Sequence, residues 1–170
     1  MAIFDKIIVL GMDNTGKTTL CNQLAEALGY QHVNSLGPKA SPWEMINFIE
    51  HTMKSNQPMI LERFCFFEEM VYGQVLRGHS NFDWNSVYLN PIREAQPLII
   101  YCRPSRERVF SFGDREQMEG VIEQREKLLA AFDDLYFKLP SKGLFAIVYD
   151  FEASTAEKLV HKIKAWKGVK

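Results

Sequence analysis

Residues 11–19 read GMDNTGKTT and match the pattern G-x-x-x-x-G-K-[ST], with Gly11, Gly16, Lys17 and Thr18 at its fixed positions. The two glycines let the backbone curl until successive N–H groups point at one phosphate group, and Lys17 adds a positive charge over the outer phosphates. The Thr18 hydroxyl is suited to bind Mg²⁺. The stretch therefore predicts a phosphate-binding loop. We expect the phosphates of a nucleotide to be held by Gly11, Asn14, Thr15, Gly16, Lys17, Thr18 and Thr19.

The residues on either side of this loop support that interpretation. Residues 4–10 (FDKIIVL) form a short apolar run rich in β-branched side chains, which is typical of a buried parallel strand. After the loop, Leu20, Leu24 and Leu28 recur at helical spacing, and Gly29 follows as a stop signal. A helix that begins within the motif would point its positive end at the bound anion. A chance turn is the alternative, but the strand, loop and helix occur in the required order.

The composition excludes several classes of protein. The 170 residues suffice for one domain with a sizeable core, and 20 basic against 21 acidic residues give a net charge of −1. Because nucleic-acid-binding proteins normally carry a basic surplus, we expect no nucleic-acid partner. The widely spaced Cys21, Cys65 and Cys102 indicate neither a disulfide framework nor a zinc site. Without a signal peptide or a long apolar run, we expect a cytoplasmic protein with no membrane partner.

Apolar runs and helical patterns alternate along the chain. We expect strands at residues 4–10, 31–34, 59–61, 98–102 and 143–150. We expect helices at about residues 17–28, 42–54, 64–77, 82–94 (interrupted by Pro91), 105–112, 116–139 and 154–167. This alternation predicts an α/β protein with three α/β/α layers, in which a five-stranded parallel sheet is covered on both faces. We expect residues 1–170 to form one domain.

Glu62 and Arg63 follow directly after the expected strand at residues 59–61. In open α/β sheets, ligands bind at the carboxyl ends of the strands, so both charged side chains should lie at the ligand-binding edge. A carboxylate there can hold Mg²⁺ or orient an acceptor hydroxyl group, and a guanidinium can bind a phosphate. A surface ion pair is the alternative interpretation.

Four arginines, Arg103, Arg106, Arg108 and Arg115, surround a break in the helical pattern at Gly113. Phosphoryl transfer requires positive charge that closes over the transition state and excludes water. We therefore predict a small lid at about residues 103–120, with Arg115 as the first choice for the acting arginine. A solvated charged helix is the alternative.

Arg125 falls within an apolar stripe of the expected helix at residues 116–139. A buried charge is costly unless it is paired, so Arg125 should either meet a carboxylate such as Glu62 or Glu68, or point at a phosphate in the active site. We hypothesise the second role.

These motifs resemble those of the thymidylate-kinase-like members of the P-loop nucleotide kinase family, in particular the compact phage type. In that family an acid within the loop contacts the 3′-hydroxyl of the acceptor, which implies this role for Asp13. The family motif D-R-[YF] resembles Glu62-Arg63-Phe64, and its arginine contacts the acceptor phosphate, which implies this role for Arg63. Residues 71–73 (VYG) are also similar and imply that Tyr72 lies near the acceptor sugar.

Aromatic residues follow the Glu62-Arg63 pair. Phe66, Phe67 and Trp84 are better suited to the hydrophobic core than to stacking on a base. One phenylalanine is nevertheless a candidate to stack on the base of the nucleotide. Phe64 and Phe67 therefore stand with Asp13, Arg63 and Tyr72 as expected substrate-binding residues. The chain departs from the family pattern in having Glu62 for the usual aspartate. It also has residues 35–38 (SLGP) where an arginine-containing motif usually follows the second strand.

The resemblance implies a nucleoside monophosphate kinase that uses ATP and Mg²⁺, with a deoxynucleoside monophosphate, and preferably a thymidylate-like pyrimidine, as the acceptor. The expected metal ligands are Thr18 and Glu62. The expected catalytic residues are Lys17, Glu62, Arg63, Arg115 and Arg125. If the chain is phage-encoded, it would act in the host cytoplasm, and a homodimer is compatible with the resemblance because the family is often dimeric.

Three other functions remain open from the sequence. A deoxynucleoside kinase would use Glu62 as the base for the 5′-hydroxyl group of the acceptor, although Asp13 weighs against it. A kinase acting on DNA is disfavoured by the balanced charge. A non-catalytic nucleotide-binding regulator is disfavoured by the intact Lys17-Thr18 and Glu62-Arg63 pairs.

Overall fold

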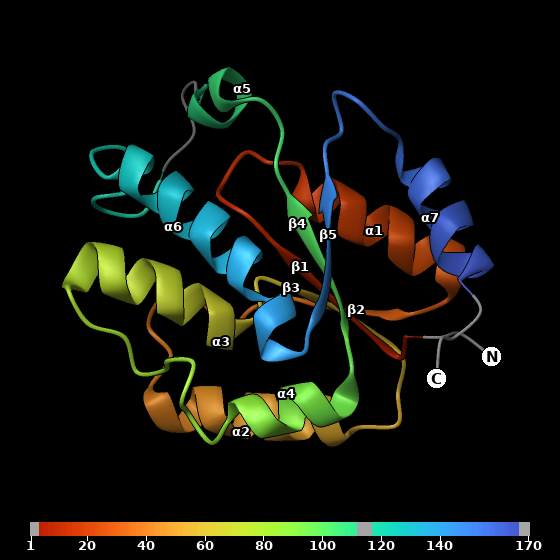
Figure 1. The fold of residues 1–170 in the computed structure, drawn as a ribbon, viewed down its shortest axis with the longest axis horizontal. Coiled ribbons are helices and arrows are strands. Elements are labelled where there is room, and N and C mark those ends of the chain that lie inside the picture. Colours follow the sequence, from red (N-terminus) through yellow and green to blue (C-terminus); the bar gives the residue numbers. More distant parts are fainter. Residues whose placement is uncertain (1–3, 112–116, 167–170) are drawn as a thin grey trace.

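Five parallel strands form the centre of the molecule, whose computed structural model describes residues 4–111 and 117–166 (Figure 1). The strands are β1 (Lys6–Leu10), β2 (Gln31–Val33), β3 (Met59–Glu62), β4 (Leu98–Cys102) and β5 (Phe145–Tyr149). Their order in the sheet is β2-β3-β1-β4-β5, and every neighbouring pair is parallel. β1 therefore lies at the middle of the sheet, and the phosphate-binding loop follows its carboxyl end.

Helices cover both faces of the sheet. They are α1 (Lys17–Leu28), α2 (Pro42–Lys54), α3 (Cys65–Glu68), α4 (Leu89–Ala95), α5 (Arg106–Phe110), α6 (Arg125–Lys138) and α7 (Ala156–Ala165), with a π-helix η1 (Glu69–Arg77) and a 3₁₀-helix η2 (Pro140–Lys142). α1 and α7 pack on one face, and α2, α3, α4 and α6 pack on the other. The predicted three-layer α/β/α fold with a five-stranded parallel sheet is confirmed.

The alternation of side chains along β1 explains why the sheet has two apolar faces. Ile7 and Val9 point into the core beneath α1 and α7, whereas Ile8 and Leu10 point into the larger core beneath the other helices. All of these side chains are fully buried, as expected for a central strand covered on both sides. This packing fixes the position at which β1 ends and the phosphate-binding loop begins.

Two predicted helix starts are confirmed in atomic detail. α1 begins at Lys17, after Gly16 with a φ of 80°, and ends at Gly29 with a φ of 71°. α2 begins with a capping box, because the Ser41 side chain accepts a hydrogen bond from the Glu44 backbone while the Glu44 carboxylate accepts one from the Ser41 backbone.

Three predicted helices differ from the structure. The helix expected at residues 64–77 is instead a short α3 followed by the nine-residue π-helix η1. Such helices are rare in proteins, and those that occur are often found at functional sites. The helix expected at residues 82–94 begins only with α4 at Leu89 and contains Pro91 within its first turn. The long helix expected at residues 116–139 begins only at Arg125, because residues 119–124 form turns in which Gly120 has a φ of 81°.

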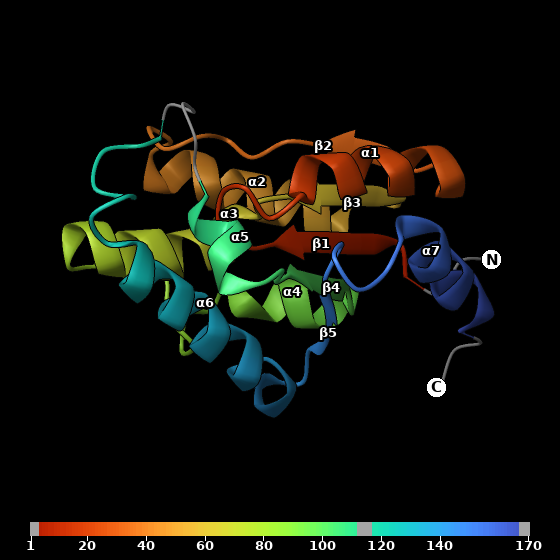
Figure 2. The same cartoon turned by 90° about the horizontal axis from the view of Figure 1, so that it is seen from above.

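Figure 2 shows that the turn after β1 and helix α5 lie at the same edge of the sheet. Two hydrogen bonds join them, from the Asn14 side chain to the backbone carbonyl groups of Arg108 and Ser111 at 2.9 and 2.7 Å. Within residues 4–111 and 117–166, every helix is too short or too polar to cross a membrane.

Candidate active site

The phosphate-binding loop encloses a cavity of about 360 Å³. Its lining consists of Asp13, Asn14, Thr15, Gly16, Lys17, Thr18, Thr19, Arg63, Gln117 and Met118. The predicted phosphate-binding residues thus surround one cavity, except for Gly11, which lies at the base of the loop. Gln117 and Met118 approach the cavity from the predicted lid segment, although Arg115 lies outside the described residues.

Gly11 is required by the close passage of β4 beneath the loop. Its φ is 142°, and a Cβ atom at this position would lie 2.6 Å from the backbone carbonyl oxygen of Cys102. That contact is too short for a side chain, and the positive φ disfavours any residue except glycine. The loop therefore depends on Gly11 for its shape rather than for a direct contact with the cavity.

Lys17 is buried within the loop. Its ammonium group donates a hydrogen bond to the Met12 carbonyl oxygen and lies 3.4 Å from the Thr15 hydroxyl oxygen. Burial lowers the pKa of Lys17, an effect that the nearby carboxylate of Glu68 opposes. A phosphate group in the cavity would place negative charge beside this ammonium group, so it would favour the charged form.

Thr18 and Glu62 come together at the carboxyl edge of the sheet. The Thr18 hydroxyl donates a hydrogen bond of 2.5 Å to Oε1 of Glu62, which is buried at the end of β3. The other carboxylate oxygen, Oε2, lies 2.9 Å from Nε2 of His32 on β2. Hydroxyl and carboxylate oxygens are the ligands that Mg²⁺ prefers, so this pair fits the metal that the sequence pattern implies.

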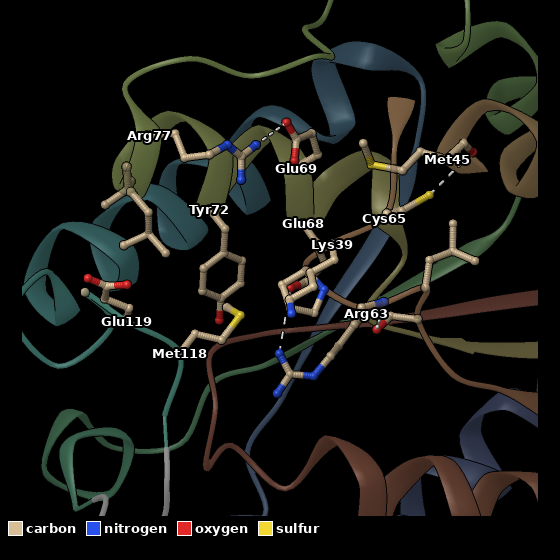
Figure 3. Close-up of a pocket in the computed structure, with 18 of the residues that line it drawn as sticks. Lys39, Met45, Arg63, Cys65, Glu68, Glu69, Tyr72, Arg77, Met118 and Glu119 are labelled. Atoms are coloured by element: carbon tan, nitrogen blue, oxygen red, sulfur yellow. Dashed lines mark hydrogen bonds and ion pairs between the residues drawn. The ribbon is translucent and has the colours of Figure 1, made fainter. Parts of the chain in front are cut away.

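A second and larger cavity, of about 910 Å³, adjoins the first (Figure 3). Its volume lies in the range of small-molecule binding sites. It is lined mainly by residues 35–40, by α3 and η1, and by residues 118–120 with Gln124. Asp13, Arg63 and Met118 line both cavities, so these three residues form the wall that the cavities share.

Arg63 is held at this shared wall by two carboxylates. Its guanidinium forms an ion pair with Asp13 and lies 3.8 Å from an oxygen of Glu68, the latter contact being visible in Figure 3. The backbone φ of Arg63 is 55°, an uncommon value for a residue with a side chain and one that is concentrated at functional sites. Arg63 is thus a cation between two cavities, held in a strained backbone conformation.

Glu68 and Tyr72 contribute buried polar atoms that find no hydrogen-bond partner within the described part of the chain. These atoms are Oε1 of Glu68 and the hydroxyl oxygen of Tyr72, and both residues line the larger cavity. Burial raises the pKa of each group. Unpaired buried polar groups are uncommon in folded proteins, so this pair marks a position where a ligand could supply partners. The sequence predicts Tyr72 near the acceptor, whereas Glu68 was considered there only as a possible partner of Arg125.

The other end of the larger cavity holds a second ion pair, between Glu69 and Arg77 on η1 at 2.5 Å (Figure 3). The same Glu69 oxygen accepts hydrogen bonds from the backbone and side-chain nitrogens of Asn81. Gly73 leaves room for this network, since a Cβ atom there would lie 2.7 Å from a guanidinium nitrogen of Arg77. These residues were not predicted as part of a site, because the segment has the pattern of an ordinary α-helix.

Two predicted substrate-binding residues are part of the core instead. Phe64 and Phe67 are fully buried and pack against each other, with ring centroids 6.2 Å apart. Phe67 also packs edge to face on Phe66. Neither ring lines either of the two cavities, because the apolar residues after β3 turn inward to cover the sheet.

The predicted lid arginines have different surroundings. Arg103 forms a two-pronged ion pair with Asp133, at 2.9 and 3.2 Å, and this contact raises its pKa. Arg106 pairs with Glu126, and the Arg108 guanidinium lies 5.5 Å from the ring centre of Phe151. Arg103 is thus tied to α6 rather than placed at the phosphate-binding loop.

Arg125 is not the buried charge that the sequence pattern predicts. It is the first residue of α6, is half-buried, and lies over the ring of Phe110 at 5.3 Å from the ring centre. The apolar stripe that seemed to enclose it is interrupted, because the residues before it form turns. Arg125 therefore packs α6 against α5.

No protein-family model and no curated protein sequence matches this chain. Solved structures do match it. The YorR protein from Bacillus subtilis, in complex with phosphorylated GDP, is 16% identical with a TM-score of 0.73, covering 94% of this chain and 93% of that chain. Deoxyadenosine kinase from M. mycoides with bound dCTP is 19% identical with a TM-score of 0.66, covering 95% of this chain and 100% of that chain.

A thymidylate kinase from Candida albicans is also similar, at 11% identity and a TM-score of 0.54, covering 96% of this chain and 91% of that chain. At these identities the likeness shows the fold alone. Kinases with different substrates, deoxyadenosine kinase and thymidylate kinase among them, occur among the similar structures, so the fold alone does not identify a substrate of this chain.

Proposed function

We propose that this protein is a nucleoside monophosphate kinase, which transfers the γ-phosphate group of ATP to a deoxynucleoside monophosphate, with a thymidylate-like pyrimidine as the favoured acceptor. The observation that carries the proposal is the position of Arg63 on the wall shared by the two cavities. A guanidinium there can bind the acceptor phosphate next to the γ-phosphate of the donor.

The smaller cavity is suited to the donor phosphates. The loop amides and the Lys17 ammonium group supply hydrogen bonds and positive charge, and residues 117–118 cover them from the other side. Thr18 and Glu62 would hold Mg²⁺, which neutralises charge on the donor phosphates when it is bound.

The larger cavity is suited to the acceptor nucleotide. When a phosphate group binds Arg63, it competes with the Asp13 and Glu68 carboxylates for the guanidinium. Asp13 then becomes free to accept a hydrogen bond from the sugar, as the resemblance to thymidylate kinases implies. The Tyr72 hydroxyl lies in the same cavity and offers a further polar contact.

The reaction itself requires no acid–base pair from the protein. An oxygen atom of the acceptor phosphate forms a bond to the γ-phosphorus of ATP, the bond from that phosphorus to the β–γ bridging oxygen breaks, and ADP leaves with the electron pair. Catalysis in such reactions consists of positioning the two phosphates and neutralising their charge. Lys17 and Arg63 supply positive charge on either side of the transferred group.

A deoxynucleoside kinase is the second candidate, and the buried Glu68 favours it. The Oε1 atom of Glu68 has no hydrogen-bond partner among the described residues. An acceptor without a phosphate group would also leave the contacts of Arg63 with Asp13 and Glu68 in place. In this case a carboxylate would accept the proton of the 5′-hydroxyl group. Glu62 is poorly placed for that role, because its two oxygens face Thr18 and His32.

A mass-spectrometric screen distinguishes the candidates. Purified protein with ATP and Mg²⁺ is incubated with deoxy- and ribonucleoside monophosphates, modified pyrimidine monophosphates and free nucleosides, with Lys17→Ala as the control. We expect diphosphate products from monophosphates and none in the control. Phosphorylation of free nucleosides alone would establish the second candidate, and ATP binding without any product would indicate a nucleic-acid kinase or a regulator.

A further inference from the structure

Three side chains with metal-binding atoms meet behind Thr18. They are Cys21 on α1, His32 on β2 and Glu62 on β3, and one ligand atom from each lies within 4.8 Å of the other two. Cys21 and Glu62 are buried, and the His32 side chain is 18% exposed. Each residue comes from a different element, so their proximity results from the fold and leaves no motif in the sequence.

The orientation of the His32 ring directs its second ring nitrogen at the Glu62 carboxylate. Its Nδ1 atom lies 3.0 Å from Oδ1 of Asn22, and an amide oxygen accepts hydrogen bonds, so Nδ1 carries a hydrogen. In neutral imidazole the other nitrogen, Nε2, is then an acceptor. It faces Oε2 of Glu62 at 2.9 Å, and a carboxylate oxygen is also an acceptor. A distance of 2.9 Å is that of a hydrogen bond, so a proton joins the two atoms in this structure, and a metal ion bound to both would replace that proton and move the two atoms slightly apart.

Metal-binding histidines typically show this arrangement. One ring nitrogen donates to a carbonyl or carboxylate oxygen, which fixes the ring and directs the lone pair of the other nitrogen at the metal. Asn22 would be the outer partner here, with Nε2 directed toward Glu62 and the Cys21 sulfur nearby.

We propose that Cys21, His32 and Glu62 bind a transition-metal dication of the zinc class at a second site, which adjoins the magnesium site of the donor nucleotide and shares Glu62 with it. Sulfur, imidazole nitrogen and carboxylate oxygen are the ligand types that Zn²⁺ takes, whereas Mg²⁺ prefers oxygen ligands alone. Binding converts the Cys21 thiol into a thiolate and releases its proton to solvent. The fourth ligand position is left to a water molecule.

The site shares Glu62 with Thr18. Oε1 of Glu62 accepts the Thr18 hydrogen bond, and Oε2 faces the proposed metal, so one carboxylate would bridge the phosphate-binding loop and the new site. A bound metal would join α1, β2 and β3 and hold Glu62 in place. Because only the folded chain brings the three ligands together, occupancy raises the midpoint of thermal unfolding. This proposal stands whichever acceptor the protein phosphorylates.

Cobalt(II) is the probe for the test, because thiolate-to-cobalt absorption reports a Cys ligand directly. The full-length protein, freed of metal by a chelator, is titrated with Co²⁺ in excess Mg²⁺, and then with Zn²⁺. We expect one equivalent of Co²⁺ to give thiolate charge-transfer absorption, Zn²⁺ to abolish it, and Zn²⁺ to raise the unfolding midpoint.

Variants identify the ligands. Cys21→Ser should remove the charge-transfer absorption, and His32→Gln should weaken Co²⁺ binding at least about tenfold while keeping the cysteine. Cys65→Ser is the matched control, because Cys65 is also buried but contacts the Met45 carbonyl oxygen on the other face of the sheet. It should leave the absorption unchanged.

Several results would overturn the proposal. They are the absence of thiolate absorption in the wild-type protein, absorption that survives Cys21→Ser, and binding that His32→Gln leaves intact. A ¹⁵N spectrum showing both His32 ring nitrogens protonated in saturating Zn²⁺ would also refute it, since a proton would then occupy the position between His32 and Glu62. If Cys21→Ser fails to fold, the wild-type spectrum and His32→Gln still decide.

Discussion

The Arg63 guanidinium and the Asp13 carboxylate form an ion pair across the boundary between the two cavities. Asp13 belongs to the phosphate-binding loop, and Arg63 is the residue directly after β3. This pair therefore joins the donor side of the site to the acceptor side. A carboxylate within a loop that binds phosphates would repel them, and the ion pair explains how the loop accommodates it. An acceptor phosphate must compete with Asp13 for the same guanidinium.

Replacing Arg63 by alanine should weaken the binding of the acceptor more than the binding of the donor. Because a hydrogen bond to a charged group contributes about 1.5–3 kcal/mol, we expect KM for the nucleoside monophosphate to rise roughly 10- to 100-fold, with a much smaller change in KM for ATP. Steady-state kinetics with each substrate varied in turn provide the measurement. The matched control is Arg93→Ala on α4, whose side chain donates to the Lys142 carbonyl oxygen. Equal effects of the two variants would count against an acceptor role for Arg63.

Gly11→Ala should destabilise the protein strongly. A methyl group there would lie 2.6 Å from the Cys102 carbonyl oxygen at a φ of 142°, so we expect a loss of at least about 2 kcal/mol in the free energy of unfolding. Gly143→Ala is the control, since Gly143 has a φ of 76° and open space around its Cα. It should cost only about 1 kcal/mol. Urea unfolding measures both, and equal losses would contradict the packing described for the loop.

Arg103→Met should affect stability and leave turnover unchanged. The ion pair with Asp133 is half-exposed and two-pronged, so its loss should cost roughly 1 kcal/mol in the free energy of unfolding. Arg106→Met, which removes the more exposed pair with Glu126, should cost less. A large fall in kcat for Arg103→Met, with an unchanged free energy of unfolding, would contradict this expectation and support the predicted role of Arg103 in a lid.

Glu68→Gln should make the stability of the protein less dependent on pH. Burial raises the pKa of Glu68 in the folded protein, so the folded state binds its proton more tightly than the unfolded state does. The resulting stability is fully present below the unfolded pKa of about 4.3 and is lost as pH rises through the higher folded pKa. Glutamine does not titrate, so the variant should gain stability relative to the wild type as pH rises from about 4 to about 8.

Urea unfolding at a series of pH values measures this difference. Glu119→Gln serves as the control, because Glu119 lines the same cavity but is exposed. If the free energies of unfolding of Glu68→Gln and the wild type differ by the same amount over the whole pH range, burial does not raise the pKa of the Glu68 carboxyl group.

Local signals made much of the fold predictable. The strand before residue 11, the glycine-rich loop and the start of α1 are consecutive in the chain, and the capping box at Ser41 lies within four residues. Each of these features is determined by residues that are neighbours in the chain, so the sequence was sufficient to predict them. The same locality explains why Thr18 and Glu62 could be placed at one edge of the sheet, since Thr18 lies in the motif that follows β1 and Glu62 is the last residue of β3.

The errors arose where a periodic pattern continued through a different backbone. Met118, Val121 and Ile122 keep helical spacing before Arg125, but Gly120 adopts a positive φ and the residues form turns. The helix therefore begins only at Arg125, and the argument for a buried Arg125 no longer holds. His32 was missed because its partners lie on α1 and β3, and such contacts depend on the register of parallel strands rather than on spacing in the chain.

The central claim is that the acceptor already carries a phosphate group. The most direct measurement compares kcat/KM for each deoxynucleoside monophosphate with that for its own parent nucleoside, in the same preparation with ATP and Mg²⁺. We predict that the monophosphate is preferred, by at least about tenfold for the best base, because it alone can bind the Arg63 guanidinium through its phosphate. Preference for the free nucleoside would contradict the account and would make Glu68 the first residue to test as the base.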